Sequence, residues 1–470
     1  MNLRHTTVNE DGWDQAIDLL ANGGVTLLAL WSDAPSVRMA ILDENAPEIA
    51  VLSFTCQNGT YPSVGAKHPP AIRLERAIRD LHGLHAVGAP DMRPWIHHSG
   101  APYAFLPAEG EGLHQIAVGP VHAGIIEPGH FRFTANGEHV VRLEQRLGYV
   151  HKGIEQLMKG ATLDGAAKLA GRASGDSTVA YAYAFAQAAE AALQIKVPPR
   201  ATYLRALMAE LERLANHFGD IGAICNDASF AIMHAQCGIL RERTLRAAQA
   251  CFGHRLLMDV IVPGGVARDL PADGPALLRE LLAEIRRVFP SLIDLYDNTA
   301  SLQDRTVTTG VVKPEYARQF GAGGYVGRAS GRNFDARRTP GYAPYGALTF
   351  EVPVLTAGDV NARVWIRIRE VEQSLALIDQ ILSTLPHGNI QVAVEAKGEA
   401  CDGFGLVEAF RGDVLVWLRL DGGGRVARCH LRDASWFQWP LLEAAVEGNI
   451  VADFPLCNKS FNCSYSGHDL

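Results

Sequence analysis

The sequence has no two cysteines close enough together to form a C-x-x-C pair. Its eight cysteines are spread along 470 residues, so the chain carries no motif of the kind that binds zinc or an iron–sulfur cluster. A chain of this length with so few cysteines is not a disulfide scaffold either. Most of the cysteines are therefore interpreted as small buried apolar residues, and Cys463 is set apart only by the residues around it.

The sequence also lacks long hydrophobic runs and an excess of basic residues. Its longest apolar run, residues 25–31, has the length of a strand, whereas a membrane-spanning helix needs ~18–20 residues. The first residues contain no signal-peptide core. The net charge of −8 argues against nucleic acid as the main partner, because phosphate binding needs clustered cations. These absences predict a soluble, cytoplasmic protein.

Common nucleotide-binding and metalloprotease motifs are absent as well. The chain has neither a G-x-x-x-x-G-K-[ST] phosphate loop nor an H-E-x-x-H zinc motif. The glycine-rich stretch 321–327 does not fit G-x-G-x-x-G, and no clear helix pattern follows it. A nucleotide-binding fold is therefore excluded at this stretch.

The sequence does contain enough apolar residues for a large core and for more than one domain. Hydrophobic residues make up 48% of the chain, and its length predicts two or three domains. Residues 1–105 have the pattern of a small α/β domain, with an amphipathic helix at 11–21 and a second helix at 74–83. Strands are predicted between these helices, around 25–31, 37–42 and 49–56. The Pro- and Gly-rich stretch 101–112 marks the domain boundary.

Residues 113–470 form a second, mostly helical domain in this interpretation. Polarity alternates on both sides of Asn136-Gly137, which predicts a β-hairpin. Residues 151–300 have helical periodicity, and Asp359 is predicted to cap a later helix. From 389 to 431 the period returns to two, which predicts a small antiparallel insert. The predicted fold class is α+β, a mainly helical bundle core with small antiparallel sheets plus the N-terminal α/β domain.

Two short polar stretches lie roughly 290 residues apart. The first is Arg172-Ala-Ser-Gly-Asp-Ser177, and the second, near the end of the sequence, is Phe461-Asn-Cys-Ser-Tyr-Ser466. They resemble the R-x-C-G-x-C and D-P-C-x-x-C stretches that hold the metals in the large subunit of NiFe hydrogenases. Serine stands here at three of the four cysteine positions, and only Cys463 remains.

Further motifs in matching order resemble one superfamily, which unites the hydrogenase large subunits and the quinone-site subunit of respiratory complex I. They are Gly119-Pro-Val-His122, Gly148-Tyr-Val-His-Lys-Gly-Ile-Glu155, and the stretches 263–270, 327–331, 335–338, 344–345, 350–353 and 358–359. Residues 1–105 resemble the separate small subunit that sits beside that subunit in complex I. Such a fusion is typical of the large subunit of formate hydrogenlyase-type membrane-bound hydrogenases.

The resemblance implies a metal cage that this chain does not complete. A hydrogenase nickel needs four thiolates, two of them bridging to iron, because these soft metals take soft ligands. The matching positions here are Ser174, Ser177, Cys463 and Ser466, and a neutral hydroxyl is a poor ligand for nickel or low-spin iron. We therefore expect no NiFe centre, and a quinone or a magnesium ion remains as a candidate ligand.

The polar residues around these positions are candidates for a ligand site. Complex I lacks the same cysteines, and the resemblance implies a cavity for a quinone headgroup. A quinone takes up protons as it is reduced, and His122 stands at the family's matching histidine; a structural core histidine is the alternative. The catalytic candidates are His122, Arg172 and Asp176, with Asp176 as a carboxylate to orient the histidine. The cofactor-binding candidates are Ser174, Ser177, Cys463, Ser466 and His468.

Two further groups of charged residues have both a structural and a functional interpretation. Glu155 matches a glutamate that binds structural magnesium in many hydrogenases, and the alternative is an ion pair with Lys152 or an arginine. A basic segment near the middle of the family pattern is expected to be a solvated loop or a surface for a neighbouring iron–sulfur subunit. Its arginines are Arg328, Arg332, Arg337 and Arg338.

The resemblance predicts one oxidoreductase subunit of a membrane-attached redox complex, peripheral on the cytoplasmic face of the inner membrane. Its partners would be a small subunit with an iron–sulfur cluster and, beyond it, membrane subunits. NADH would bind elsewhere in such a complex. Three functions stay open: reduction of a quinone-like or other small acceptor, hydrogen chemistry at an altered NiFe site, and a non-catalytic role in coupling electron transfer to an ion pump.

Overall fold

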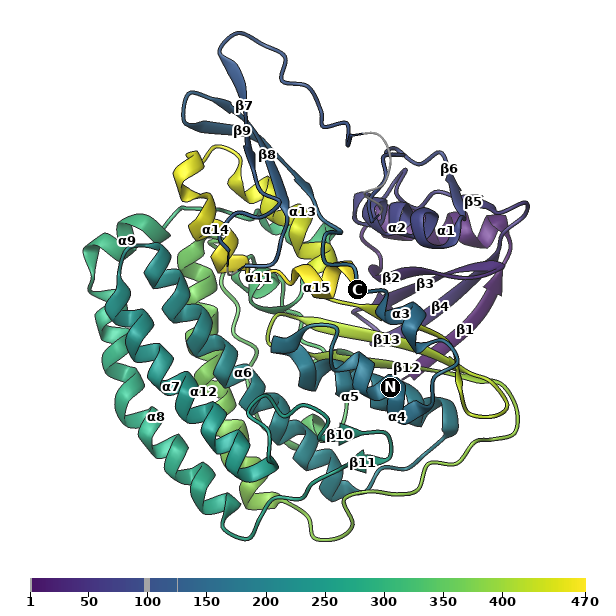
Figure 1. The fold of residues 1–470 in the computed structure, drawn as a ribbon, viewed down its shortest axis with the longest axis vertical. Coiled ribbons are helices and arrows are strands. Elements are labelled where there is room, and N and C mark those ends of the chain that lie inside the picture. Colours follow the sequence, from purple (N-terminus) through teal and green to yellow (C-terminus); the bar gives the residue numbers. More distant parts are fainter. Residues whose placement is uncertain (1, 97–101, 125) are drawn as a thin grey trace.

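The computed structural model of the protein describes residues 2–96, 102–124 and 126–470. It confirms the predicted α+β class, because helices dominate and the strands form several small, separate sheets (Figure 1). A bundle of long helices lies on one side of the molecule, and an N-terminal unit with its own sheet lies on the other. Among the described residues, no helix is both long and apolar enough to cross a bilayer.

The N-terminal unit contains the predicted helices and strands and three additional strands. Its elements are β1 (Asn2–Val8), α1 (Glu10–Ala21), β2 (Thr26–Asp33), β3 (Ser36–Asp43), β4 (Glu48–Thr55), β5 (Thr60–Pro62), α2 (Ile72–His82) and β6 (His85–Val87). The main sheet has the order β1-β4-β3-β2, with β1 parallel to β4 and the other neighbours antiparallel. β1 is mostly polar, so the alternation that identifies a half-buried strand is missing from its sequence. α2 ends at Gly83 (φ +68°), the predicted C-cap.

A three-stranded sheet follows and projects from the body of the molecule (Figure 1). Its strands are β7 (Leu113–Val118), β8 (His130–Asn136) and β9 (His139–Arg146), paired in that order. β8 and β9 pair across the turn that follows Asn136, which confirms the predicted hairpin. β7 is largely exposed, so its sequence gives no clear pattern of apolar residues.

The helical core is built around four long helices, α6, α7, α8 and α12, which pack side by side (Figure 1). The helices of this part are α3 (Ile154–Met158), α4 (Leu163–Ala170), α5 (Thr178–Leu193), α6 (Pro199–Asp227), α7 (Ala231–Phe252), α8 (Gly274–Asp297), α9 (Ala300–Thr306), α10 (Pro314–Gln319), α11 (Gly324–Ala329), α12 (Val360–Thr384), α13 (Ser435–Val446), α14 (Phe454–Phe461) and α15 (Tyr465–Asp469). A short ribbon joins β10 (Ile261–Val262) and β11 (Gly265–Val266). The predicted apolar face of α6 is buried: Leu204, Leu207, Leu211, Leu214 and Phe218 are each at most 1% exposed.

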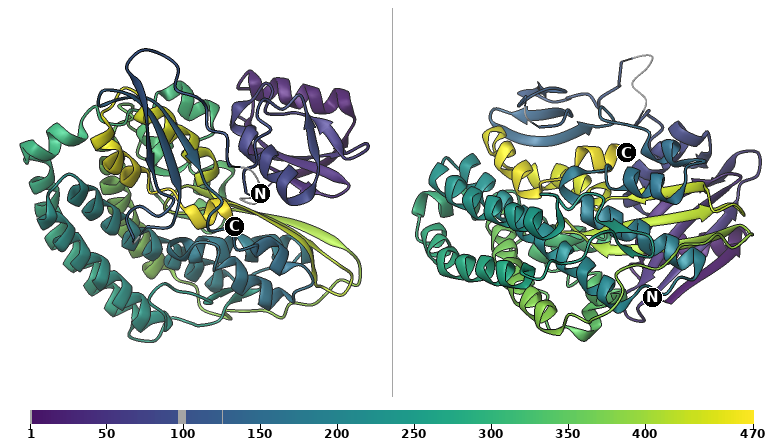
Figure 2. Two further views of the ribbon diagram at one scale, coloured as in Figure 1. Left: turned by 45° about the horizontal axis from the view of Figure 1, so that its top comes forward. Right: turned by 60° about the horizontal axis from the view of Figure 1, so that its bottom comes forward.

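A third sheet lies at the centre of the molecule. Its strands, in order, are β12 (Cys401–Glu408), β13 (Asp413–Leu420) and β14 (Val426–Arg432). One face packs tightly on α5, where a Cβ at Gly405 would lie 2.1 Å from the carbonyl oxygen of Ala184. The other face packs on the N-terminal sheet, with the rings of Trp417 and Trp31 5.6 Å apart. The strands of the predicted antiparallel insert therefore join the N-terminal unit to the helical core (Figure 2).

The start of α12 allows a direct test of its predicted cap. The Asp359 carboxylate accepts hydrogen bonds from the backbone N–H groups of Ala362 (2.7 Å) and Thr308 (2.8 Å), and the residue is only 4% exposed. We expect Asp359→Ala to lower the free energy of unfolding by about 2 kcal/mol, measured by urea denaturation, because two buried donors lose their acceptor. Asp359→Asn keeps one acceptor and is expected to lose less. Equal losses in the two variants would contradict the capping role.

Candidate functional site

The two polar stretches that are far apart in the sequence meet in the structure. Residues 174–177 lie just before α5, and residues 462–464 form the turn between α14 and α15. The hydroxyl oxygens of Ser174 and Ser464 lie 2.8 Å apart, although 290 positions separate the two residues in the chain. We define the polar cage as Ser174, Asp176, Ser177, Arg411, Cys463 and Ser464. The two stretches are thus brought together, and the contact is made by Ser464, which is not one of the predicted frame positions.

Arg411 binds groups of both polar stretches, and sequence reasoning missed it. This residue lies in the turn between β12 and β13, and its side chain is 3% exposed. Its guanidinium donates to the Asp176 carboxylate (2.6 Å), the Ser177 hydroxyl (3.1 Å) and the carbonyl oxygen of Asn462 (2.5 Å). One cation therefore connects both polar stretches. The available signal was an arginine in a turn between two apolar strands, since a guanidinium that is buried there requires a nearby acid.

Asp176 is bound on one side by Arg411 and on the other by two hydroxyls. Its Oδ1 atom accepts hydrogen bonds from Ser174 (2.7 Å) and Ser177 (3.3 Å). Burial by itself would raise the pKa of Asp176, but the charge and hydrogen bonds of Arg411 outweigh it and hold the pKa below its ordinary value. The side chain nevertheless stays 38% exposed. Asp176 is therefore an ionised group that faces both the interior and solvent.

Cys463 is the only frame position that keeps a thiol. It is 5% exposed, and its sulfur lies 3.9 Å from the amide oxygen of Gln438. Burial raises the pKa of the Cys463 thiol well above its ordinary value, so the sulfur stays protonated at neutral pH. A protonated thiol is a weak ligand and a weak nucleophile.

The structure places the other predicted residues around the polar cage rather than in it. Arg172 forms an ion pair with Asp259 at the surface, and its side chain is 40% exposed. His468 is fully buried, with Nδ1 2.8 Å from Asp469 and its ring stacked on Trp436. The Ser466 backbone N–H donates to Glu127 (3.0 Å).

His122 packs edge-on against Phe131, and in the described part of the chain it makes no hydrogen bond to the polar cage. Burial, and then the charge of Lys459, lower the pKa of His122 below its ordinary value. The carboxylate of Asp176, the candidate partner for this ring, is bound to Arg411 instead. Asp176 is therefore not the hydrogen-bond partner of this ring.

The donor set of the frame does not fit a NiFe centre. Three hydroxyls and one protonated thiol stand where soft metals need thiolates. The Arg411 cation also donates to one of these hydroxyls, that of Ser177, and to the neighbouring Asp176. Over residues 2–96, 102–124 and 126–470, no group of three or more His, Cys, Asp or Glu side chains is arranged to hold a metal ion. A buried guanidinium also disfavours a second positive charge at this place.

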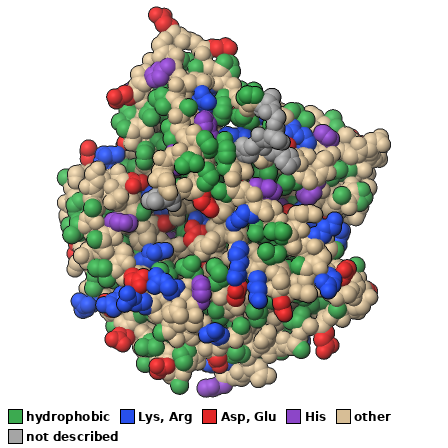
Figure 3. Space-filling view, in the orientation of Figure 1, with side chains coloured by type: hydrophobic (Ala, Val, Ile, Leu, Met, Phe, Trp, Pro, Cys, Tyr) green, Lys and Arg blue, Asp and Glu red, His purple; other side chains and the backbone are tan. Residues whose placement is uncertain are grey.

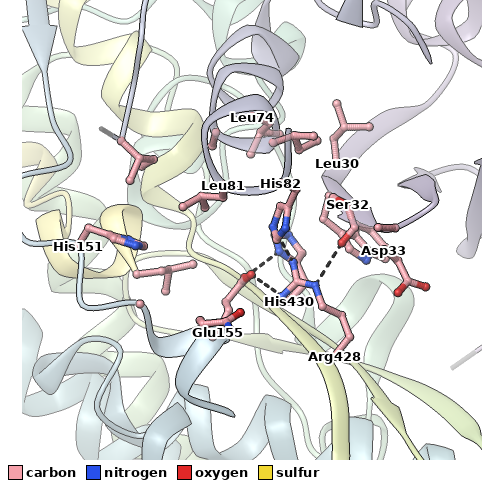
Figure 4. A pocket seen from close by; sticks show the side chains of 18 of the residues that line it. Leu30, Ser32, Asp33, Leu74, Leu81, His82, His151, Glu155, Arg428 and His430 are labelled. Carbon is pink, nitrogen blue, oxygen red and sulfur yellow. Dashed lines mark hydrogen bonds and ion pairs between the residues drawn. The ribbon is translucent and has the colours of Figure 1, made fainter. Parts of the chain in front are cut away.

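Glu155 lies at the edge of a cavity of about 680 Å³, between the N-terminal unit and the core (Figure 4). Its carboxylate accepts hydrogen bonds from Arg428 (2.7 Å), from Nδ1 of His430 (2.9 Å) and from the Leu431 N–H (2.9 Å). Burial would raise the pKa of Glu155, but the nearby Arg428 and His430 lower it well below its ordinary value. The carboxylate is thus paired with an arginine, and a magnesium ion would have to displace that arginine.

The same cavity is bounded by both parts of the chain. Leu30, Ser32, Leu74, Leu81 and His82 come from β2 and α2 of the N-terminal unit, as Figure 4 shows. Arg428 of β14 crosses to this side and donates to the carbonyl oxygen of Ser32 (3.2 Å). It also lies 3.4 Å from the His82 ring nitrogen. The ion pair of Glu155 therefore takes part in holding the N-terminal unit on the core.

The basic segment that was expected at the surface is mostly buried, so that prediction was wrong. Arg328, Arg337 and Arg332 are 0%, 2% and 5% exposed, and only Arg338 is exposed. Arg328 donates to Glu370 (2.8 Å) and to Glu408 (2.8 Å). These arginines therefore neutralise carboxylates inside the core, and they form no surface for a partner.

Comparisons with known proteins agree with this fold. The family described as respiratory-chain NADH dehydrogenase, 49 Kd subunit, matches residues 228–399 and 393–469. Formate hydrogenlyase subunit 5 of Escherichia coli (strain K12) is 32% identical, over 92% of this chain and 79% of that protein. One of the NADH-quinone oxidoreductase subunits of Desulfotalea psychrophila is 32% identical, over 72% of this chain and 91% of that protein. A chain in the structure of the membrane-bound sulfane sulfur reductase, an archaeal respiratory membrane complex, superposes with a TM-score of 0.71 and 25% identity, covering 77% of this chain and 99% of that one.

Proposed function

Because the chain belongs to the family of the 49 kDa subunit of respiratory-chain NADH dehydrogenase, we propose that it transfers electrons from a partner iron–sulfur subunit to a small, quinone-like acceptor. The chain is an oxidoreductase subunit of the hydrogenase and complex I type, since its relatives are subunits of such enzymes. The acceptor, its site at the polar cage and the absence of a NiFe centre are the proposed part.

The Arg411 guanidinium in the polar cage carries this proposal. Reduction of a carbonyl acceptor builds negative charge on oxygen, and a fixed, buried cation with N–H donors stabilises such charge. The hydroxyls of Ser174 and Ser177 lie within hydrogen-bond distance of Asp176, so the cage also contains exchangeable protons. A quinone would bring the redox chemistry, and the cage residues would orient its carbonyl group and supply protons to it.

We further propose the assembly in which this chain works. Residues 1–105 would correspond to the small subunit that is separate in complex I, and residues 113–470 to the large one. Membrane subunits are partners in assemblies of this type. We propose that this chain also binds a small subunit with an iron–sulfur cluster. We propose that it lies on the cytoplasmic face of the inner membrane. The alignment with formate hydrogenlyase subunit 5 over 92% of the chain supports the fused arrangement.

One observation favours a second candidate, a subunit that couples redox change to membrane subunits without chemistry of its own. The inner side of the polar cage is bridged by the Arg411 side chain and by the short contact between Ser174 and Ser464. A cage filled in this way transmits movement between its two stretches even when no ligand enters. The two candidates differ in whether changing Arg411 alters acceptor reduction or only coupling.

Metal analysis of the purified complex tests the first premise. We expect nickel far below the amount of this chain, and no infrared bands of iron-bound carbonyl or cyanide, because the frame lacks thiolates. Nickel in an amount equal to that of the chain, together with those bands, would overturn the metal-free proposal. Iron from the partner's clusters is expected in either case and does not decide the question.

Electron transfer to a short-chain quinone tests the second premise. Arg411→Lys keeps the charge but loses the planar fork, and we expect it to lower the rate of quinone reduction by about 10-fold or more. Arg172→Lys, at an exposed ion pair outside the polar cage, is the matched control and is expected to leave the rate unchanged. An unchanged rate in Arg411→Lys would favour the coupling role. His122→Gln in the same assay tests whether this histidine, which the family resemblance implied as a proton donor, takes part in quinone reduction.

A further inference from the structure

We propose that the oxygens of Asp176, Ser174 and Ser464 form a proton relay between a water-accessible cavity beside α6 and α7 and the inside of the polar cage, with Glu212 as the buried acid that feeds it. This proposal rests on the proposed function, because the relay supplies the protons that a quinone-like acceptor takes up with its electrons. It assigns a role to a cavity and a carboxyl group that electron transfer alone does not use.

The cavity reaches the polar cage from outside. It has a volume of about 140 Å³, room for several water molecules, and its polar lining includes Asp176, Glu212, Asn216 and Arg241. Asp176 is 38% exposed, and Arg255 at the rim is 47% exposed, so the cavity is open to solvent. Figure 3 shows basic side chains gathered over α7 on this face of the molecule.

The relay itself is a row of short oxygen–oxygen contacts. Asp176 Oδ1 lies 2.7 Å from the Ser174 hydroxyl, which lies 2.8 Å from the Ser464 hydroxyl. Ser464 lies in the chain between Cys463 and Ser466, on the other polar stretch, so the row crosses from one stretch to the other. Both distances are typical of O–H···O hydrogen bonds, and each hydroxyl can accept a proton on one side and give one on the other.

Glu212 is placed to hold the proton at the outer end. It is 9% exposed, and its carboxyl group accepts from the N–H groups of Val179 (2.7 Å) and Ala180 (3.2 Å) at the start of α5. The Asn216 amide donates to the backbone oxygens of both Asp176 and Glu212, which fixes the two acids relative to each other.

The charged groups around Glu212 decide how tightly it holds that proton. Burial, and then the negative charge of Asp176, raise the pKa of Glu212 to about 8, against the N–H donors at the start of α5 and the nearby Arg213. Arg241 of α7 and Arg255 of the following loop line the same cavity. Glu212 therefore carries a proton at neutral pH and gives it up in mild alkali.

The relay step balances without any further reactant. The partner's iron–sulfur cluster supplies two electrons, one at a time, and the quinone carbonyl oxygens gain two protons. For each proton, Glu212 first protonates the ionised Asp176 through water in the cavity. Ser464 gives its hydroxyl hydrogen to the acceptor, Ser174 replaces that hydrogen, and Asp176 passes its new proton to Ser174. Asp176 is then ionised again, Glu212 regains a proton from water in the cavity, and the serines end each step unchanged.

The relay is tested with the purified complex, using reduced methyl viologen as donor and a short-chain quinone as acceptor. Ser174→Ala interrupts the row, and we expect the rate of quinone reduction to fall about 10-fold or more, with a larger difference between H₂O and D₂O. Ser330→Ala is the matched control, because Ser330 is equally buried and donates only to the Val326 carbonyl of its own helix. Its rate and isotope effect are expected to equal those of the wild type.

A second variant, Glu212→Gln, distinguishes the role of the buried acid from the role of the serine hydroxyls. The wild-type rate is expected to fall as the pH rises through about 8, where Glu212 loses its proton, and Glu212→Gln is expected to remove that fall. Glu242→Gln, an exposed carboxylate on α7, is expected to keep it. A wild type that reduces quinone while Ser174→Ala and Glu212→Gln both behave like their controls would overturn the relay alone. A wild-type complex that reduces no quinone would overturn the proposed function and the relay with it.

Discussion

Replacing Arg328 with methionine is expected to lower the free energy of unfolding by about 3–5 kcal/mol, measured by urea denaturation. The guanidinium is completely buried between Glu370 and Glu408, each 1% exposed, and it donates to both at 2.8 Å. Methionine fills much of the same volume but removes the guanidinium from both carboxylates, although Glu370 keeps its contact with His217 (2.7 Å). The cost of unpaired buried charge therefore dominates over the small change in packing.

Another arginine of the same segment, Arg338, provides the control for this result. Arg338→Met, at an exposed position of the same segment, is expected to change the free energy of unfolding by less than about 1 kcal/mol. A similar small change in Arg328→Met would show that the two glutamates are neutral in the folded protein.

The pH dependence gives an independent check on Arg328. Burial would raise the pKa of Glu370, but Arg328 and His217 hold it well below its ordinary value of 4.5. A carboxyl group whose pKa is lowered on folding contributes stability above its ordinary pKa and loses that contribution as the pH falls through its folded value. The difference in the free energy of unfolding between wild type and Arg328→Met is therefore expected to be largest at neutral pH and to become smaller in acid.

Replacing Arg411 with methionine is expected to abolish quinone reduction and to lower the free energy of unfolding by about 3 kcal/mol. The guanidinium holds Asp176, Ser177 and the carbonyl oxygen of Asn462 together, so its loss removes these bonds between the two polar stretches. The loss of stability is smaller than for a fully buried pair because Asp176 is 38% exposed and reaches water. Activity in the purified complex and urea denaturation measure the two effects.

A double substitution separates the electrostatic contribution to the loss of stability in Arg411→Met from the contribution of lost packing. Asp176→Asn removes the charge that Arg411 neutralises, so the double variant with Arg411→Met is expected to be more stable than the sum of the single losses predicts. A coupling of about 1 kcal/mol or more would support the ion pair. Strictly additive losses would mean that Arg411 acts only through packing and through its bond to Asn462.

Local patterns predicted most of the fold, because they depend on neighbouring residues. The helical period of α6, the hairpin after Asn136 and the cap at Asp359 are all confirmed. The order of motifs also pointed to the two polar stretches that meet, although the contact runs through Ser464 and not through the predicted Ser466. These features require no knowledge of which distant segments pack together.

The residues that complete the site could not be predicted in this way. Arg411 lies more than 200 positions from Asp176, and nothing in the turn beside it identifies the acid that it binds. Arg328 looked exposed because its segment is basic, whereas its partner Glu408 lies 80 positions away on β12. A charged side chain is buried only where tertiary packing supplies its counter-charge, and a single sequence does not record that pairing.

The central sheet also sets an order of events during synthesis of the chain. The N-terminal sheet is complete within the first 55 residues, but the face that carries Trp31 is covered by Phe404, Leu415 and Trp417. Because the ribosome makes those residues near the end, this apolar face leaves the exit tunnel long before its cover exists. Shortening the chain before β12 leaves the face open permanently. Truncated or stalled chains are therefore expected to aggregate or to bind chaperones through their first-made domain.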